Sequence, residues 1–224
     1  MGRTGLHSGT ALGDVMVSKE DLHAWIEALQ QVYAENKQYL TDLDAAIGDA
    51  DHGINMDRGF TSVKAELKKS GQAGIDQLLK SVAMVLIKTV GGASGPLYGS
   101  FFLRASAACA GKTELRPSDL VAMFEAGLRG VVERGKAELN DKTMVDALDP
   151  AVDAMKQALE NGAGLREILR KGASAGEAGM KKTIPLQARK GRASYLGERS
   201  MGHQDPGATS SYFLLKKAFD ILGG

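Results

Sequence analysis

Apolar residues recur at helical spacing along most of the chain. Ser18 is a good N-cap residue with Asp21 three positions on, and apolar positions then repeat from Leu22 to Tyr33. The same spacing predicts seven more helices, over residues 57–69, 75–90, 97–110, 117–133, 144–159, 165–180 and 208–222. No segment alternates apolar and polar residues between hairpin turns. The pattern therefore predicts an all-α fold of about eight helices, whose short loops favour antiparallel neighbours.

Two segments lack this periodicity. Residues 41–55 (TDLDAAIGDADHGIN) are interpreted as the end of the first helix and a loop. Residues 1–16 are rich in glycine and aperiodic, so we expect a disordered N-terminal extension. A single helical domain is then predicted over residues 17–224.

Composition narrows the class of protein. The formal net charge is +1, so bulk electrostatics indicate neither a nucleic-acid partner nor a membrane-surface partner. No run of about 18 apolar residues is present, and no transmembrane helix is expected. The one cysteine, Cys109, cannot form an internal disulfide and favours a reducing, cytoplasmic compartment. Its Ala-rich surroundings indicate a small core residue rather than a nucleophile.

Three aspartates form the densest chemical feature of the sequence. Asp49 and Asp51 stand two apart between glycines, and Asp44 lies just before them. Three carboxylates that converge without Lys or Arg nearby repel one another, and a divalent cation relieves that repulsion. An EF-hand starting at Asp49 fails, because its fifth and twelfth positions are Gly53 and Phe60. Magnesium held together with phosphates fits better, although ordinary loop aspartates remain an equal alternative at this point.

Glycine-rich segments lie between the predicted helices. Gly91–Pro96 (GGASGP) suits an anion site at a helix start, although a plain turn explains it as well. Residues 130–137 nearly match a P-loop, but the last position is alanine and the preceding segment is predicted helical, so we reject that interpretation. Lys190 and Arg192 flank a glycine and suit phosphate charge, or are merely solvated. Asp205–Gly207 is typical of a turn that opens the last helix.

Taken together, these motifs resemble the L subunit of dihydroxyacetone kinase, its nucleotide-binding component. The segments that carry the resemblance are LDAAIGDADHGINMDRGF, VGGASGPLYGSFF, RGKAELNDKTM and QARKGRASYLGERSMGHQDPGA. They occur in the same order and spacing and span nearly the whole chain. The resemblance implies a barrel of eight antiparallel helices with the nucleotide site in loops at one end.

The resemblance also implies the site residues. Two Mg²⁺ ions would be bound by Asp44, Asp49 and Asp51 and would bridge the phosphates of ADP or ATP. The implied nucleotide contacts are His52, Gly53, Ile54, Asn55, Ala93, Ser94, Gly135, Met144, Arg192, Asp205, Pro206 and Gly207. Ser94 and the neighbouring backbone are assigned to the phosphates, Met144 to the purine or ribose, and Arg192 to transition-state charge. No catalytic residue is assigned.

The partners follow from the same resemblance. The γ-phosphoryl group would pass to dihydroxyacetone held on a separate K subunit, and a phosphocarrier M subunit of the phosphotransferase system would rephosphorylate bound ADP. The alternatives are exchange of free ATP, or a nucleotide sensor that binds a transcription regulator. A purely structural helical bundle is a third alternative. A homodimer and the identity of the acceptor ketose stay open.

Overall fold

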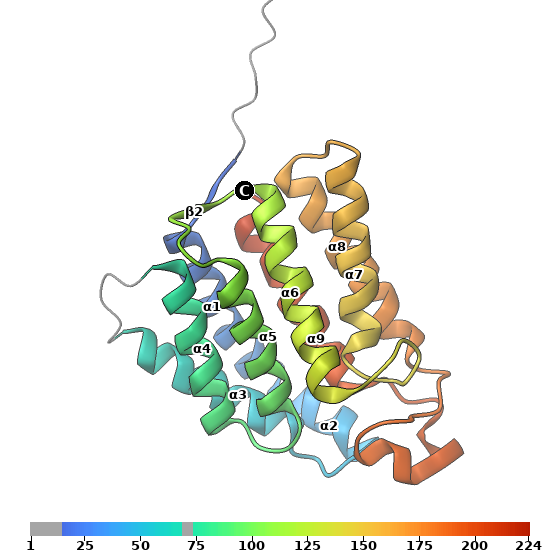
Figure 1. The fold of residues 1–224 in the computed structure, drawn as a ribbon. Coiled ribbons are helices and arrows are strands. Elements are labelled where there is room, and N and C mark those ends of the chain that lie inside the picture. The colour runs from blue at the N-terminus through green and yellow to red at the C-terminus, as the bar shows by residue number, and fades with distance from the viewer. Residues whose placement is uncertain (1–14, 69–73) are drawn as a thin grey trace, which may run out of the picture.

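The computed structural model describes residues 15–68 and 74–224. Helices dominate this part of the chain, with one short pair of strands (Figure 1). The elements are β1 (Val17–Ser18), α1 (Lys19–Glu35), α2 (Lys37–Ile47), α3 (His52–Leu67), α4 (Ile75–Thr89), α5 (Ser94–Ala108), β2 (Glu114–Leu115), α6 (Pro117–Gly135), α7 (Val145–Glu160), α8 (Leu165–Lys182), a 3-10 helix η1 (Arg192–Ser200) and α9 (Pro206–Leu222).

The helices begin where the sequence offers caps. The hydroxyl of Ser18 accepts from the backbone N–H of Asp21 at 3.1 Å, and the Asp21 carboxylate accepts from the Ser18 N–H at 2.8 Å. This is the capping box expected from the sequence. Pro117 and Pro206 occupy the first turns of α6 and α9, where the missing N–H costs nothing.

The core is aromatic at its centre. The indole of Trp25 lies 6.0 Å from the ring of Phe102 and 5.7 Å from that of Phe124, centroid to centroid. Its N–H donates to the carbonyl of Leu214 at 3.2 Å, which ties α1 to α9. Cys109 is fully buried, and burial raises the pKa of its thiol to about 11. The prediction of an inert core cysteine is thus confirmed.

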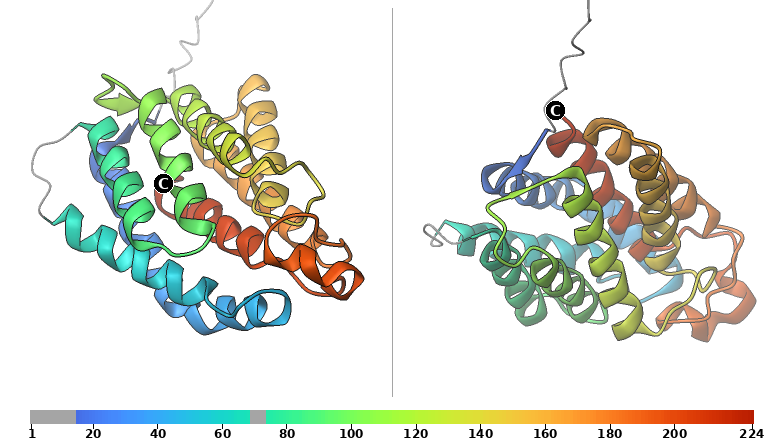
Figure 2. Two further views of the ribbon diagram at one scale, coloured as in Figure 1. Left: turned by 60° about the horizontal axis from the view of Figure 1, so that its bottom comes forward. Right: turned by 45° about the horizontal axis from the view of Figure 1, so that its top comes forward.

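The helices follow one another around this core. From α3 to α9 each long helix contacts the next one in the chain, and α1 contacts both α9 and α3. The predicted all-α class is confirmed, while a barrel in the strict sense stays a prediction. Four connections gather at one end of the molecule together with α2 and η1, whereas β2 and the C-terminus lie at the other (Figures 1 and 2). No helix of the described residues is long and apolar enough to cross a bilayer.

The interpretation of residues 41–55 as a helix end and a loop is wrong in part. It contains the second half of a separate helix, α2, whose buried positions are Leu40, Asp44 and Ile47. An aspartate at an inward position interrupts the apolar stripe and hides the helix from a periodicity argument. The structure begins α3 at His52 rather than at Asp57. Polar residues are buried in its first turn, and they hide the start of the helix in the same way.

Three smaller differences concern the start of one helix and the presence of short elements. α5 begins at Ser94 rather than Leu97, and η1 was not predicted. The expectation of no strands is wrong for β1 and β2, which pair antiparallel through two residues each. The end of the helix predicted for 57–69 and nearly all of the predicted disordered extension, 1–16, lie outside the described residues.

Candidate functional site

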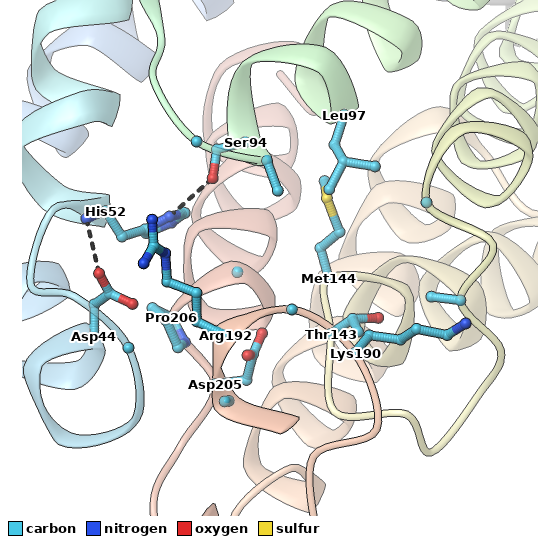
Figure 3. A pocket seen from close by; sticks show the side chains of 18 of the residues that line it. Asp44, His52, Ser94, Leu97, Thr143, Met144, Lys190, Arg192, Asp205 and Pro206 are labelled. Carbon is cyan, nitrogen blue, oxygen red and sulfur yellow. Dashed lines mark hydrogen bonds between the residues drawn. The ribbon is translucent and has the colours of Figure 1, made fainter. Parts of the chain in front are cut away.

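A pocket of about 510 Å³ opens at the end where the connections gather. Its lining comes from four places: α2 with the α2–α3 loop, the α4–α5 loop, the end of α6 with the α6–α7 loop, and the segment between α8 and α9 (Figure 3). This volume suits a small ligand of nucleotide size. Residues more than 150 positions apart in the sequence therefore meet at one site.

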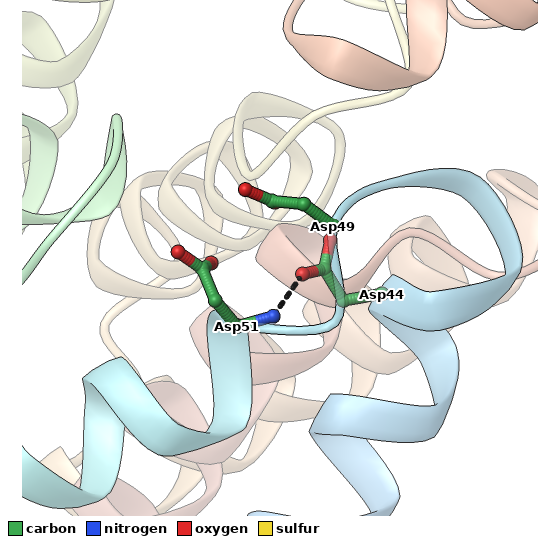
Figure 4. A group of neighbouring side chains, drawn as sticks. All are labelled: Asp44, Asp49 and Asp51. Atoms are coloured by element: carbon green, nitrogen blue, oxygen red, sulfur yellow. Dashed lines mark hydrogen bonds between the residues drawn. The ribbon is translucent and has the colours of Figure 1, made fainter.

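One wall of the pocket is acidic. One carboxylate oxygen of each of Asp44, Asp49 and Asp51 lies within 4.8 Å of the others (Figure 4). Asp44 is buried on α2, and its Oδ2 accepts from the backbone N–H groups of Asp51 at 2.8 Å and His52 at 3.1 Å. Asp44 therefore shapes the loop that presents the other two carboxylates. Ala50 between them has a φ of +59°, a left-handed turn that lets Asp49 and Asp51 face one another.

The close turn depends on a glycine. A Cβ on Gly48 would lie 2.1 Å from Oδ1 of Asp44, so no larger residue fits without displacing that carboxylate. Three convergent oxygen ligands, one buried and two more accessible, form a donor set that fits a hard divalent cation such as Mg²⁺. The expectation that no Arg or Lys lies nearby is wrong: Nε of Arg192 lies 3.0 Å from Oδ2 of Asp49.

Four helices begin at the pocket. Their first residues, His52 of α3, Ser94 of α5, Val145 of α7 and Pro206 of α9, all line it. The first turn of a helix carries backbone N–H groups without intrahelical partners and a partial positive charge. Some of these groups already have internal acceptors, as in the bond from His52 to Asp44. The arrangement nevertheless favours an anionic ligand beside the acidic wall.

A buried hydrogen-bond network stands behind this anion site. Nδ1 of His52 lies 3.0 Å from the hydroxyl of Ser94, and its Nε2 lies 2.9 Å from that of Ser210. Burial lowers the pKa of His52 to about 4, so the imidazole is neutral. Tyr98 donates to the Ser210 hydroxyl, which itself donates to the carbonyl of Gly207.

The network determines where protons lie. Because the hydroxyl of Ser210 donates its proton to the carbonyl of Gly207, its oxygen accepts from Nε2–H of His52. Nδ1 then accepts from the hydroxyl of Ser94. Ser94 thus turns its oxygen lone pairs toward the pocket. Only its backbone N–H remains to donate to a phosphate.

The rest of the lining divides by polarity. Leu97, Val131 and Met144 form an apolar wall, while Lys190 and Arg192 bring positive charge from the segment before α9. This apolar wall suits a flat heterocycle, and the basic wall suits phosphates.

Asp205 closes the pocket floor. It caps α9 by accepting from the N–H of Ala208 at 2.6 Å, and burial raises its pKa to about 7.

Comparison with known proteins agrees with this geometry. The model of one family, the DAK2 domain, matches residues 46–220. The chain belongs to that family. It is 45% identical over 200 residues to the PEP-dependent dihydroxyacetone kinase, ADP-binding subunit DhaL, of Escherichia coli (strain K12), which covers 89% of this chain and 95% of that protein. The resemblance to the L subunit of dihydroxyacetone kinase is confirmed.

Other relatives extend the comparison. The PTS-dependent dihydroxyacetone kinase, ADP-binding subunit DhaL, of Lactococcus lactis is 40% identical over 198 residues, 88% of this chain and 95% of that protein. Among solved structures, the dihydroxyacetone kinase of C. freundii in complex with AMP-PNP and Mg²⁺ has a TM-score of 0.71 at 21% identity. That match covers 98% of this chain and 37% of the other, and it supports the fold alone.

Most residues expected at the site of this DAK2 domain line the pocket. They are Asp44, Asp49, Asp51, His52, Ala93, Ser94, Gly135, Met144, Arg192, Asp205, Pro206 and Gly207. Gly53, Ile54 and Asn55 do not. A Cβ on Gly53 would lie 2.0 Å from the carbonyl of Lys37, Ile54 is 44% exposed, and Asn55 is buried and accepts from Arg58.

The sequence argument missed several lining residues. Leu97 and Val131 were counted as helix positions and Arg134 followed a predicted helix end, and their place at the pocket depends on where α5 and α6 begin and end. Thr143 and Lys142 belong to the segment NDKTM. That segment was used for the family resemblance, but only its Met144 was given a role at the site.

Proposed function

We propose that this chain is the ADP/ATP- and Mg²⁺-binding subunit of a dihydroxyacetone kinase. It would present the γ-phosphoryl group to dihydroxyacetone held on a separate K subunit. One observation carries the proposal: three convergent carboxylates and four helix starts face the same pocket. Cation ligands beside an anion site are what a metal–nucleotide complex requires. The printed names of the relatives, ADP-binding subunits of dihydroxyacetone kinases, agree with it.

Asp44, Asp49 and Asp51 would hold two Mg²⁺ ions, which supply neutralisation of the phosphate charge when bound. Asp44 contributes orientation as well as charge, because its second role is to hold the N–H groups of the loop. Phosphoryl transfer depends chiefly on positioning and charge neutralisation, and this rigid loop provides the positioning. No residue of the chain is assigned as a general base.

The nucleotide would lie across the pocket. Its phosphates would meet the backbone around Ala93 and Ser94, the N-terminus of α3 at His52, and the guanidinium of Arg192. Its base and ribose would lie toward Met144 and Gly135, on the apolar side, and Asp205–Gly207 would form the floor. For Gly53 and Asn55 we propose a supporting role through the packing of α3 rather than direct contact, and for the exposed Ile54 we propose no role at the site.

The donor of the phosphoryl group would be a phosphocarrier M subunit that rephosphorylates ADP in place. The names PEP-dependent and PTS-dependent given to two related subunits support this choice over free ATP. The chain would work in the cytoplasm beside both partners.

The experiment combines the purified chain with a K subunit, dihydroxyacetone and either a phosphorylated M subunit or ATP. The proposal expects phosphorylated dihydroxyacetone with the M subunit and far less with ATP under single-turnover conditions. Turnover with ATP alone would favour an ATP-exchanging kinase. Absence of transfer with both donors, together with nucleotide-dependent binding of a regulator, would favour the sensor and contradict the proposal.

A further inference from the structure

Lys142 is a buried lysine whose ammonium group lies among backbone carbonyls. Its side chain is 1% exposed. Nζ donates to the carbonyl oxygens of Thr183 at 2.9 Å, Leu186 at 3.1 Å, Ser200 at 2.7 Å and His203 at 2.5 Å. Every one of these acceptors belongs to the segment between α8 and α9. The name carbonyl cage is used below for these four oxygens.

The cage is suited to a cation and to little else. Four carbonyl oxygens around one point carry partial negative charge, and an ammonium group offers three protons to them. Burial lowers the pKa of Lys142, while the carboxylate of Asp205 acts in the opposite direction. A neutral side chain here would leave several buried carbonyls without their donor, which is costly.

The segment held by the cage forms part of the pocket. It contains Lys190 and Arg192, which line the basic wall, and Arg192 reaches Asp49 across the site. Few hydrogen bonds tie residues 184–203 to the rest of the described chain. Besides those of Lys142, the N–H of Arg189 donates to the carbonyl of Asp141 at 3.0 Å, and at the segment's start the N–H groups of Ile184 and Leu186 donate back to the carbonyls of Lys181 and Thr183.

Lys142 also belongs to the opposite side of the site. It directly precedes Thr143 and Met144, which line the wall assigned to the base and ribose. Its own φ is +64°, a left-handed conformation that glycine adopts more easily than lysine. A lysine at such a position indicates that its side chain, rather than its backbone, is what the site requires.

We propose that Lys142 is a positioning residue of the nucleotide site. Its ammonium group fixes the segment 183–203 against the α6–α7 loop, and so sets the position of Arg192 relative to the phosphates. Lys142 acts through these backbone contacts and not on the reacting atoms. The inference rests on the proposed nucleotide-binding function. It adds the contacts through which Lys142 joins the α6–α7 loop to the segment that carries Arg192.

The test uses the full chain with the variant Lys142→Gly, because glycine suits the left-handed backbone and leaves a channel where the side chain was. The matched control is Lys136→Gly, since Lys136 is exposed and also has a positive φ, +51°. ADP affinity is measured by calorimetry with MgCl₂. Hydrogen exchange is followed separately for residues 183–203 and for α1, α4 and α5.

Lys142→Gly is expected to weaken ADP binding by about tenfold or more, as is typical for residues that hold ligating groups in place. Exchange within 183–203 should accelerate while the three helices stay protected. n-Butylammonium, which equals the missing side chain, should restore both properties. 1-Butanol and NaCl at equal concentration should restore neither, and Lys136→Gly should behave as the unmodified protein.

A second variant, Lys142→Met, keeps the apolar part of the side chain and removes the ammonium group, and it should lose affinity in the same way. Unchanged affinity in either Lys142 variant, unchanged exchange in 183–203, or no difference between butylammonium and butanol would overturn the inference. So would general unfolding of both variants, which would make Lys142 a support of the whole domain. If the unmodified chain binds no ADP, the proposed function fails, whereas the exchange data still decide whether Lys142 holds the segment.

Discussion

Arg192 and Asp49 form an ion pair across the mouth of the pocket, with Nε of the guanidinium 3.0 Å from Oδ2 of the carboxylate. The pair joins the start of η1 to the loop between α2 and α3, two segments that are more than 140 residues apart. Both side chains are substantially exposed, so the pair itself adds little stability. Arg192 thus offsets part of the negative charge of the acidic wall.

Replacing Arg192 should therefore have opposite effects on the two ligands. Arg192→Met removes a competitor for Asp49, and the affinity for Mg²⁺ alone should rise slightly, within about fivefold for an exposed pair. The affinity for ADP with Mg²⁺ should fall roughly 10–100-fold, because a charge-assisted hydrogen bond to phosphate is lost. Calorimetric titration with MgCl₂ and then with ADP measures both. Arg199→Met, an exposed neighbour outside the pocket, is the control, and weaker binding of Mg²⁺ alone by Arg192→Met would contradict this account.

The three aspartates should differ in what their loss does. Asp49→Asn should reduce Mg²⁺-dependent ADP affinity on the order of 10–100-fold, with less than about 0.5 kcal/mol change in unfolding free energy. Asp44→Ala should reduce affinity and also destabilise the protein by about 1–3 kcal/mol, because the N–H groups of Asp51 and His52 lose their acceptor. Urea denaturation and ADP titration separate the two effects. Asp42→Asn, exposed on α2, should change neither, and equal stability of Asp44→Ala and Asp49→Asn would refute the orienting role of Asp44.

Asp205 predicts a specific pH dependence of stability. Burial raises its pKa from the ordinary 3.8 to about 7, so the folded protein holds this proton more tightly than the unfolded chain. Its contribution to stability is complete below pH 4 and is lost as the pH rises through 7. Asp205→Asn removes that dependence. Relative to the unmodified protein, the nucleotide-free variant should gain up to about 4 kcal/mol between pH 4 and pH 8.

Urea denaturation at several pH values in that range measures the gain. Asp42→Asn, at an exposed position of α2, controls for the effect of removing any carboxylate. A difference between Asp205→Asn and the unmodified protein that does not change with pH would show that the pKa of Asp205 is the same in the folded protein and the unfolded chain, and would contradict this account.

Gly53 and Ile54 provide a test of residues carried over from the family. A Cβ at Gly53 would meet the carbonyl of Lys37 at 2.0 Å, so Gly53→Ala should push α3 away from α2 and cost about 1–3 kcal/mol. Ile54 is exposed and does not line the pocket, so Ile54→Ala should change stability by less than about 0.5 kcal/mol and leave ADP affinity unaltered. Thermal denaturation and ADP titration provide the measurements. If a stable Ile54→Ala protein binds ADP more weakly, the direct contact implied by the family resemblance is supported and this prediction is contradicted.

The sequence predicted the helices whose inward positions are apolar. The start and core face of α1 were predicted because Leu22, Trp25 and Ile26 continue a regular stripe after a capping box, although α1 ends at Glu35, before the predicted end. α2 was not, since Asp44 occupies one of its buried positions and belongs to the candidate metal site rather than to the apolar core. The helix boundaries that failed are thus the ones where polar residues face the pocket.

The site was predictable where its residues are clustered in sequence. The spacing of Asp49 and Asp51 indicates a cation site, and the glycine between Lys190 and Arg192 indicates a phosphate contact. Lys142 carried no such signal, because the carbonyls around its ammonium are 41 to 61 positions away in the chain. Every residue has a backbone carbonyl, so only the folded structure shows which carbonyls surround the ammonium group.

Native mass spectrometry of the purified chain tests the central claim most directly, namely that Asp44, Asp49 and Asp51 hold a metal–nucleotide complex. With ADP and MgCl₂ present, this account predicts one ADP and two Mg²⁺ ions per chain, and loss of the nucleotide when EDTA removes the metal. A spectrum that shows no bound nucleotide with Mg²⁺ in excess, or ADP binding that EDTA leaves unchanged, would contradict it.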